Sequence, residues 1–478
     1  MTSMTARTRD DHHDATRQLQ QAFQRALDER VGESADFAAR EAAGLELANE
    51  LCWADQHADL CRRSALFVSD ELWIDGKHYR RHSTKMGQGK YGGLCGMLVV
   101  PRALYREVGV RNGRTVVPLE LDAGLVERAT PALANALAQG YADAPSRQVH
   151  KAMKACHRQP PSRSTTERAG KAIGRAMGLA LPRIEPAIRA FEQLPAGTCA
   201  VSVGLDRTSV PMEEPAGPDK LPVKRTTPRL RKAPAPVEVN YRMAYVGTFT
   251  LLDADGRGLV TRRYGIAGDM DPEPILQSLR DDLAHALQQQ PGLPVGLLQD
   301  GAPEMWNLMR GCLADVDELD QWFEAIDRHH LLERLGDALR RAGLVASWRT
   351  RQLAEWSDSL DKDDATIDHI EQFVRTLRDG LRGEARRKLS EHVTYIENNK
   401  DRMRYVRLRN TGLPVGSGAT EGACKSLVMI RAKACGQRWH DDGIDAVFVL
   451  RGLSLSDRLP HAMELLRRDY SATVRLAA

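Results

Sequence analysis

Residues 199–266 constrain the fold most, because three strand-like runs follow one another there after a largely helical half. Residues 199–206 (CAVSVGLD) alternate, with Val201, Val203 and Leu205 on one face, which is the period-two pattern of a strand. Residues 239–252 and 259–266 are β-rich and flank a turn at 253–258, so they predict a hairpin. Three antiparallel strands in chain order are therefore expected.

The segment between the first strand and the hairpin, residues 211–236, is rich in proline and in basic residues. Proline has no N–H to donate to a sheet, so the segment predicts a long loop and not a central strand. Its basic residues are Lys220, Lys224, Arg225, Arg229, Arg231 and Lys232.

Helices and short strands alternate after the hairpin, which predicts an α/β fold with a mixed sheet. Helical pattern covers 272–290, 303–313 and 329–341, and short apolar runs at 295–298 and 322–327 predict two more strands. Residues 344–409 are helical in pattern almost throughout, with a row of apolar residues from Ile367 to Leu381 at 3-4-3-4 spacing, so an all-α insertion is expected. The last stretch opens with Gly416-Ser417-Gly418 and predicts helices at 421–433 and 442–453.

The first half is mostly helical in pattern. Residues 15–53 predict one or two amphipathic helices, residues 73–117 predict a small sheet or hairpin with pieces at 92–100 and 115–119, and further helices follow at 130–138, 146–157 and 164–177. The last two are separated by a tight segment and resemble a helix-turn-helix, with Ser164 and Glu167 as a capping box. Its basic face consists of Arg163, Arg168, Lys171 and Arg175. Such a helix fits a major groove, but a solvated helix of an ordinary bundle explains the same pattern equally well.

Composition narrows the possible classes of protein. The 478-residue chain has a net charge of +4 and only 5 % aromatic residues, so a nucleic-acid partner must be sought in local clusters of Lys and Arg. Its eight cysteines include no C-x-x-C pair, which argues against a disulfide scaffold and a zinc finger. No apolar run approaches 18 residues and the chain begins with a polar segment, so we expect neither a membrane span nor a signal peptide, and a cytoplasmic location.

Three acids stand where a two-metal site for phosphoryl transfer needs them. Asp206 lies on the first strand, Asp300 at the end of the fourth and Glu421 on a late helix. Two Mg²⁺ or Mn²⁺ ions require carboxylates that converge from separate elements. Each acid alone has a structural explanation, since Asp300-Gly301 is a common turn pair and Glu421 suits the start of a helix.

Four phrases of the sequence resemble bacterial insertion-sequence DDE transposases, in particular the ISKra-type group. They are VGLDRTSVPMEEP (203–215), LLQDGAPEMW (297–306), IDRHHLLERL (326–335) and LPVGSGATEGACKSLVMIRAKACGQRW (413–439). The resemblance implies an RNase H-like core with Asp206, Asp300 and Glu421 as catalytic metal ligands and a helical insertion before the glutamate. Asp327-x-x-His330 is similar to a C/D-x-x-H signature of Mutator-like transposases near the active site, which makes His330 a catalytic candidate, although a packing role is the more frequent one for such a histidine. Residues 105–118 contain no cysteines where many relatives carry a zinc-binding pair, which leaves zinc in doubt.

The resemblance also implies a domain order: an N-terminal helical and small β region (1–125), a helix-turn-helix region (126–195), the first part of the catalytic core (196–343), the insertion (344–409) and the C-terminal helices with Glu421 (410–478). The implied activity is binding of the terminal inverted repeats of an insertion sequence, cleavage of their 3′ ends and transfer of those ends to target DNA. The partners would then be double-stranded DNA and further copies of the chain, as a homodimer or larger assembly on the nucleoid.

Two clusters of basic residues flank the last acid, and either could border the DNA backbone. Those after it are Lys425, Arg431, Lys433 and Arg438, and those before it are Lys400, Arg402, Arg404, Arg407 and Arg409. A solvated surface is the ordinary explanation for about half of such residues. Two other functions remain open at this point: a nuclease on the same fold that does not join strands, and a DNA-binding regulator that no longer uses its acids.

Overall fold

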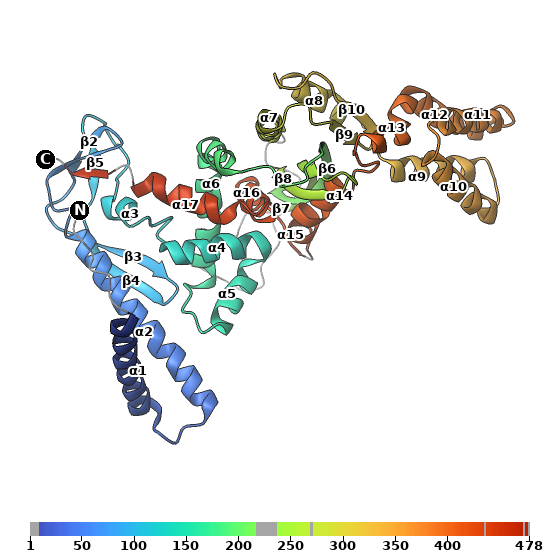
Figure 1. Ribbon diagram of the computed structural model, residues 1–478. Coiled ribbons are helices and arrows are strands. Elements are labelled where there is room, and N and C mark those ends of the chain that lie inside the picture. Colours follow the sequence, from blue (N-terminus) through green and yellow to red (C-terminus); the bar gives the residue numbers. More distant parts are fainter. Residues whose placement is uncertain (1–8, 217–236, 268–270, 435, 472–473, 477–478) are drawn as a thin grey trace. The chain divides into compact units, whose positions relative to one another are not determined.

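A computed structural model describes residues 9–216, 237–267, 271–434, 436–471 and 474–476 (Figure 1). The chain forms two compact units. Unit 1 comprises Met1–Ile173 with Leu465–Ala478, and unit 2 comprises Gly174–Glu464. No helix among the described residues combines the length and the apolar content that crossing a membrane requires.

The described part of unit 1 contains two long helices, two small sheets and three shorter helices, together with the first turns of the helix that begins at Arg163 and the last turns of the helix that ends at Ser471. The helices are α1 (Arg9–Val31), α2 (Phe37–Ser64), α3 (Pro118–Asp122), α4 (Pro131–Asp143) and α5 (Ser146–Ala155). One sheet has the order β11-β1-β2-β5, and β3 pairs with β4 in a hairpin. The strands are β1 (Glu71–Ile74), β2 (Lys77–Arg81), β3 (Gly87–Gly93), β4 (Gly96–Arg102), β5 (Tyr105–Glu107) and β11 (Val474–Leu476). The two N-terminal helices and the small β region are as expected.

Two strand predictions in unit 1 were wrong in detail. Residues 92–100 are not one strand but the end of β3, a turn and most of β4. Residues 115–119 contribute only an isolated bridge, between Val116 and Tyr105. Pro118 then begins α3, because a proline is tolerated in the first turn of a helix, where an N–H has no partner.

The helix expected at 164–177 is α6 (Arg163–Phe191), and it is longer than predicted although it contains Pro182 and Pro186. The predicted capping box was also wrong. The Oγ of Ser162, not of Ser164, accepts the N–H of Thr165 at 3.4 Å, because the helix begins at Arg163. Glu167 instead pairs with Lys171 at 3.3 Å. Whether α5 and α6 act as a DNA-binding helix-turn-helix remains a prediction.

Unit 2 is built on a five-stranded mixed sheet of order β10-β9-β6-β7-β8. Its strands are β6 (Ala200–Pro215), β7 (Val237–Leu252), β8 (Gly258–Ile266), β9 (Val295–Gln299) and β10 (Phe323–Ile326). The first three are antiparallel, with Ala200 opposite Leu252, and β9 and β10 run parallel to β6. The predicted α/β fold with a mixed sheet and the predicted hairpin are therefore confirmed.

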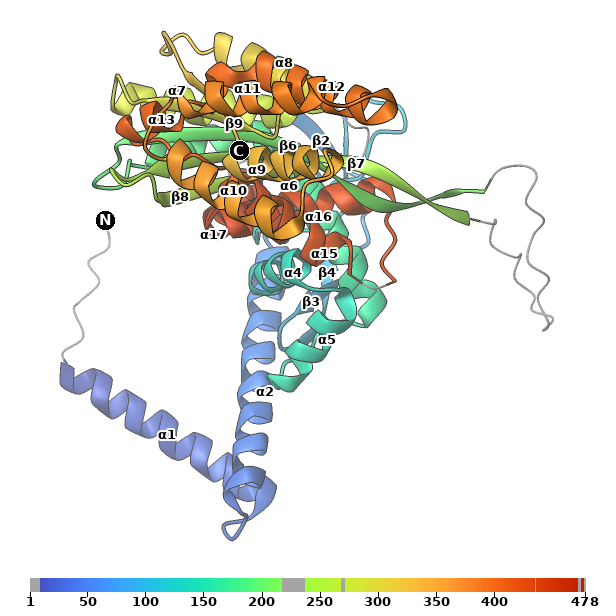
Figure 2. The same ribbon diagram turned by 90° about the vertical axis from the view of Figure 1, so that its right-hand side faces the viewer.

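The first strand is longer than expected, and the loop assigned to 211–236 was wrong for its first five residues. β6 and β7 continue as a two-stranded arm beyond the other strands, to Pro215 and from Val237 (Figure 2). Pro211 fits there because its nitrogen points away from β7, on the side where its own C=O accepts the N–H of Trp439. The basic residues Lys220, Lys224, Arg225, Arg229, Arg231 and Lys232 lie outside the described residues.

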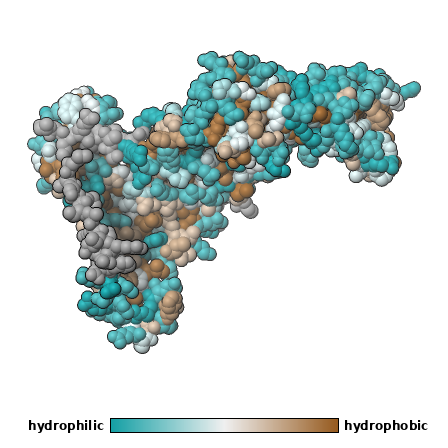
Figure 3. All heavy atoms as spheres, in the orientation of Figure 1, coloured by the Kyte–Doolittle hydropathy of each residue, from teal (hydrophilic) through white to brown (hydrophobic). Residues whose placement is uncertain are grey.

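The helices that follow the hairpin belong either to the α/β part of unit 2 or to the predicted all-α insertion. Those before the insertion are α7 (Glu273–Gln289), α8 (Pro303–Ala314) and α9 (Arg328–Arg341). The insertion consists of α10 (Ala346–Leu360), α11 (Thr366–Asp379), α12 (Gly383–Asn399), the 3₁₀ turn η1 (Lys400–Met403) and α13 (Tyr405–Asn410). Ile367, Ile370 and Val374 are fully buried, so the 3-4-3-4 row is a core seam of the insertion. Its outer surface is mostly hydrophilic (Figure 3).

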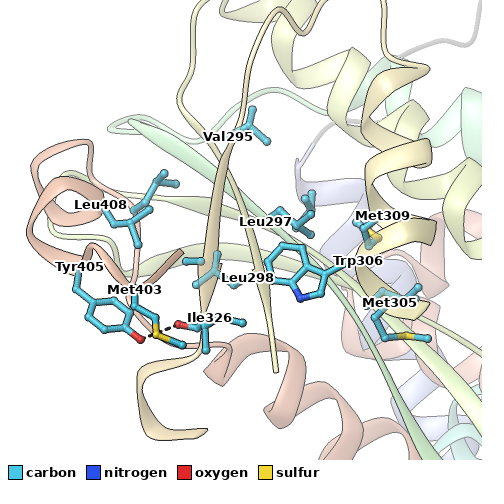
Figure 4. Close-up of a cluster of buried hydrophobic side chains, with 14 of the residues drawn as sticks. Val295, Leu297, Leu298, Met305, Trp306, Met309, Ile326, Met403, Tyr405 and Leu408 are labelled. Carbon is cyan, nitrogen blue, oxygen red and sulfur yellow. Dashed lines mark hydrogen bonds between the residues drawn. The ribbon is translucent and has the colours of Figure 1, made fainter. Parts of the chain in front are cut away.

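The insertion returns to the sheet through a shared apolar core. Figure 4 shows Met403, Tyr405 and Leu408 beside side chains of β9 and β10, and Trp306 of α8 beside Leu297. The buried Tyr405 hydroxyl donates to the carbonyl of Ile326 at 3.1 Å. This contact fixes the end of the insertion against the edge strand.

The C-terminal part begins with one continuous helical segment that contains a π-helical turn. It comprises α14 (Gly418–Ala423), the π segment η2 (Cys424–Met429) and α15 (Ile430–Ala432), and it is followed by α16 (Asp441–Leu455) and α17 (Leu459–Ser471). Both helices predicted here are confirmed. π-Helical turns are rare and often occur at functional sites.

Candidate active site

The three acids expected from the sequence line one pocket of about 210 Å³ in unit 2. Asp206 comes from β6, Asp300 follows β9 directly and Glu421 lies on α14. β6 and β9 are parallel neighbours, with Val201 opposite Val295. Residues a few positions further along these strands therefore reach the same edge of the sheet, where His330 and Lys425 also line the pocket.

Helix α14 reaches the sheet closely enough to bring Glu421 to this edge because residue 204 is a glycine. A Cβ on Gly204 would clash with the Oγ1 of Thr420. The hydroxyls of Thr420 and Thr248 are 2.8 Å apart and form a buried hydrogen bond that holds α14 to β7. The glycine thus sets the distance between the helix that carries one acid and the strand that carries another.

The surroundings of Asp206 act on the pKa of its carboxyl group in both directions. Burial raises the pKa of Asp206 above its ordinary value, and the neighbouring Asp300 raises it further. The backbone N–H of Arg207 at 2.6 Å and the Cys424 thiol at 3.4 Å donate to its carboxylate and act in the opposite direction. Among the described residues, neither Asp206 nor Asp300 forms an ion pair with a Lys or Arg side chain, so both carboxylates are available to a cation.

Asp327 connects the loop before α14 to the start of α9. Its side chain is buried and caps α9 by accepting the N–H of His330 at 3.0 Å. Its other oxygen accepts both the N–H and the hydroxyl of Ser417, the latter at 2.8 Å. Burial alone would raise the pKa of Asp327, but these hydrogen bonds outweigh it and hold the pKa below the ordinary value. Asp327 is therefore an ionised anchor for the segment that leads to Glu421.

His330 lies between the carboxylates of Asp327 and Glu421. Its Nδ1 is 3.3 Å from Asp327 and 3.9 Å from Glu421, and this atom is buried without a hydrogen-bond partner among the described residues. The imidazole ring of His330 would therefore lie next to any group that binds to the Glu421 carboxylate. The structure thus places His330 in the pocket without showing a catalytic role.

Two sets of side chains are candidates for a cation site, and they share Glu421. Asp327, His330 and Glu421 offer ligand atoms that all lie within 4.8 Å of one another. However, both Asp327 oxygens already accept hydrogen bonds, and Mg²⁺ prefers oxygen ligands to imidazole. Asp206, Asp300 and Glu421 supply only carboxylate oxygens, the ligand type that Mg²⁺ prefers, and they line one pocket. Their ligand atoms do not all lie within 4.8 Å of one another in this conformation.

The insertion contributes a side chain to the loop that carries Asp300. The hydroxyl of Tyr395 on α12 donates to the backbone carbonyl of Asp300 at 3.3 Å. Gly301 adopts φ = +99°, and a Cβ there would lie 2.7 Å from the same hydroxyl. The guanidinium carbon of Arg334 lies 3.9 Å from the centre of the Tyr395 ring. Glycine is thus required at 301 both by backbone conformation and by this contact.

The basic residues after Glu421 differ in their surroundings. The Lys425 side chain is 67 % exposed and lies 3.8 Å from Glu421. Lys433 donates to the Oγ1 of Thr208 at 2.8 Å, and Arg438 is exposed. Arg431 is only 2 % exposed and stacks 5.0 Å from the centre of the Trp439 ring, so the expectation that it contacts DNA is not compatible with this conformation.

Most basic residues before Glu421 are engaged in ion pairs, within the insertion or between the insertion and strand β10. Lys400 and Arg404 pair with Asp368, Arg402 with Glu324, and Arg409 with Asp361. These contacts favour the structural explanation for this cluster. On α6, Lys171 pairs with Glu167 and Arg175 with Asp442, whereas Arg163 and Arg168 are exposed; their contact with DNA remains a prediction.

Sequence reasoning missed several residues that shape the pocket. Gly204, Cys424 and Tyr395 each contact a residue about a hundred or more positions away in the chain, so no local pattern identifies them. Ser417 had a signal, because the run Gly416-Ser417-Gly418 marks a sharp turn before a helix.

No protein-family model matches the chain, and no curated protein matches it. Among solved structures, the chain is similar to one described as the Drosophila P element transposase strand transfer complex, with 12 % sequence identity, 72 % of this chain and 81 % of that chain covered, and a TM-score of 0.25. A similarity at that TM-score carries no argument about fold or function.

Proposed function

We propose that the chain is a DNA transposase with an RNase H-like catalytic core, which cleaves DNA strands and joins them to a target. The observation that carries the proposal is the convergence of Asp206, Asp300 and Glu421 in one pocket from two strands and a helix. Carboxylates brought together in this way are what a two-metal phosphoryl-transfer site requires.

The topology of unit 2 supports an RNase H-like core. Three antiparallel strands are followed by two strands parallel to the first, in the order β10-β9-β6-β7-β8. Two of the acids lie where β6 and its parallel neighbour β9 reach the same sheet edge, which is where the carboxyl ends of parallel strands present a site. The narrower ISKra-type assignment rests on the sequence resemblance alone.

Asp206, Asp300 and Glu421 would hold two Mg²⁺ or Mn²⁺ ions. Such a pair supplies an activated attacking oxygen and a stabilised leaving oxygen in an in-line displacement. The residues of the chain fit this role because Asp206 and Asp300 are free of Lys and Arg partners within the described part of the chain. Asp327 holds the chain segment that leads to Glu421 through its hydrogen bonds to Ser417. The His330 side chain lines the same pocket, where an imidazole can accept or donate a proton.

DNA would be held by exposed basic side chains close to the acids. Lys425 reaches solvent one helical turn after Glu421, where its ammonium can meet a phosphate. The helices α5 and α6, with Arg163 and Arg168, are the proposed reader of the terminal inverted repeats, acting in a homodimer or larger assembly that joins two DNA ends.

The test is cleavage and joining by the purified full-length chain, with Mg²⁺ or Mn²⁺ and a labelled duplex that carries the inverted repeats flanking its gene. Asp206→Asn, Asp300→Asn and Glu421→Gln should each abolish cleavage while DNA binding persists. Asp320→Asn, which changes an exposed acid of the same unit, should cleave like the parent chain.

Each alternative predicts a different result. Cleavage without joining would indicate a nuclease on this fold. Binding without cleavage would indicate a regulator, and a variant of the three acids that keeps full cleavage would remove that residue from the site.

A further inference from the structure

Two large apolar side chains are exposed at the edge of the acidic pocket. Met429 is 46 % exposed and Ile430 is 65 % exposed. The residues on either side of them in the helical segment, Leu427 to Val428 and Arg431 to Ala432, are buried. Positions 429 and 430 therefore belong to the outer face of an amphipathic helix, where polar residues are expected. Met429 also lines the pocket that contains the three acids.

Lysines border this apolar pair along the chain. Lys425 precedes it by one turn of the helical segment and is largely exposed. Lys433 follows directly after the segment ends at Ala432, is half-buried and donates to Thr208 at 2.8 Å. We refer to Lys425, Met429, Ile430 and Lys433 as the basic-apolar strip. The strip combines cations, which attract a phosphate backbone, with apolar groups that need a partner other than water.

Double-stranded DNA offers both partners to such a strip. Its phosphates meet the lysines, and its stacked bases present apolar faces when a base step is opened. DNA-bending proteins insert Ile, Met or Leu side chains between base pairs in this way, with partial unstacking. A protein partner would satisfy the apolar pair, but it would not account for lysines on both sides of it or for the contact of Met429 with the acidic pocket.

We propose that Met429 and Ile430 form a wedge that enters the base stack next to the scissile phosphate. This inference rests on the proposed function, because a scissile phosphate bound in the acidic pocket would place the neighbouring base step at the strip. Opening that step frees the strand to bend toward the acids. The side chains act by positioning the DNA, and they take no part in the chemical step.

The first test measures unstacking in the uncleaved complex. The full-length chain is bound, in EDTA, to the terminal-repeat duplex with 2-aminopurine beside the cleavage position. We expect a severalfold rise in fluorescence with the parent chain and with Leu179→Ala, which removes an exposed leucine of α6 in the same unit. The double variant Met429→Ala/Ile430→Ala should bind the duplex but show less than a third of that rise. An equal rise in the double variant would overturn the proposal.

The second test asks whether pre-opened DNA makes the wedge unnecessary. In Mg²⁺, the double variant should cleave the paired duplex at least tenfold more slowly than the parent chain, and should approach the parent rate on a duplex with two mismatches at that step. Slow cleavage of both duplexes would show that the pair only supports the fold, and parent rates on both would show that it has no role. A changed sedimentation coefficient in the variant would assign the strip to contact with a second copy. If the parent chain cleaves neither duplex, the proposed function itself fails.

Discussion

Glu324 provides the clearest measurable link between the sheet and the insertion. Its carboxylate lies at the start of β10, where it accepts hydrogen bonds from Arg310 of α8 at 2.6 Å and from Arg402 of η1 at 2.7 Å. Burial would raise the pKa of Glu324, but the two guanidinium groups outweigh it and lower the pKa from the ordinary 4.5 to about 2. The side chain is 19 % exposed, so solvent screens these pairs only in part.

The expected magnitude follows from this shift. One pKa unit corresponds to about 1.4 kcal/mol, so the ionised Glu324 stabilises the folded state by about 3 kcal/mol at neutral pH. A carboxyl whose pKa is lowered on folding contributes fully above its unfolded pKa, and the contribution is lost as the pH falls toward its folded pKa. Glu324→Gln should therefore cost about 3 kcal/mol at pH 7 and about 2 kcal/mol at pH 3.5.

The assay is urea-induced unfolding followed by tryptophan fluorescence at pH 7, 5 and 3.5. Trp306 is a local probe, since its ring centre lies 4.7 Å from the guanidinium carbon of Arg402. Glu355→Gln changes an exposed glutamate of α10 and should stay within about 0.5 kcal/mol of the parent chain. A loss for Glu324→Gln that is below about 1 kcal/mol, or that does not depend on pH, would refute the reasoning.

Three further changes have definite expected outcomes. Asp282→Asn removes a fully buried carboxylate that three arginines contact, and unfolding should become easier by about 3 to 5 kcal/mol because the guanidinium groups remain buried; thermal melting checks this. Gly204→Ala should displace α14 and reduce cleavage more than tenfold, and Thr420→Ala, which removes the clashing hydroxyl, should restore part of it in the double variant; cleavage rates that Gly204→Ala leaves unchanged would contradict the account of that contact. Tyr395→Phe removes one hydrogen bond to the Asp300 carbonyl, worth about 1 kcal/mol, and should raise the Mg²⁺ concentration for half-maximal cleavage about fivefold with the fold intact; a metal titration of cleavage decides this.

The order of elements in unit 2 could be predicted from the sequence because each element has a strong local pattern. The alternation at Val201, Val203 and Leu205 identified β6, and the turn at 253–258 identified the hairpin. The end of β6 could not be predicted, because the rule that excludes proline from strands fails on an edge. Pro211 lies in a strand only because its nitrogen faces away from β7.

The three acids of the candidate site could be predicted from the sequence, but the residues that position them could not. Asp206, Asp300 and Glu421 follow or lie on elements whose order implies one sheet edge, so their convergence could be expected. The anchor of Asp327 on Ser417 and the contact of Tyr395 with the Asp300 loop depend on how distant helices meet. The sequence could not decide between DNA contact and a structural role for Arg402 and Arg404 for a similar reason, since their acidic partners come from β10 and α11.

The central claim is that Asp206, Asp300 and Glu421 together hold divalent metal. The most direct measurement is the anomalous scattering of Mn²⁺ in crystals of the full chain soaked with that ion, with Asp300→Asn crystals as the control. The account predicts Mn²⁺ bound by carboxylate oxygens of Asp206, Asp300 and Glu421 and lost in the control. Mn²⁺ bound by Asp327, His330 and Glu421 without Asp206, and retained in the control, would contradict it.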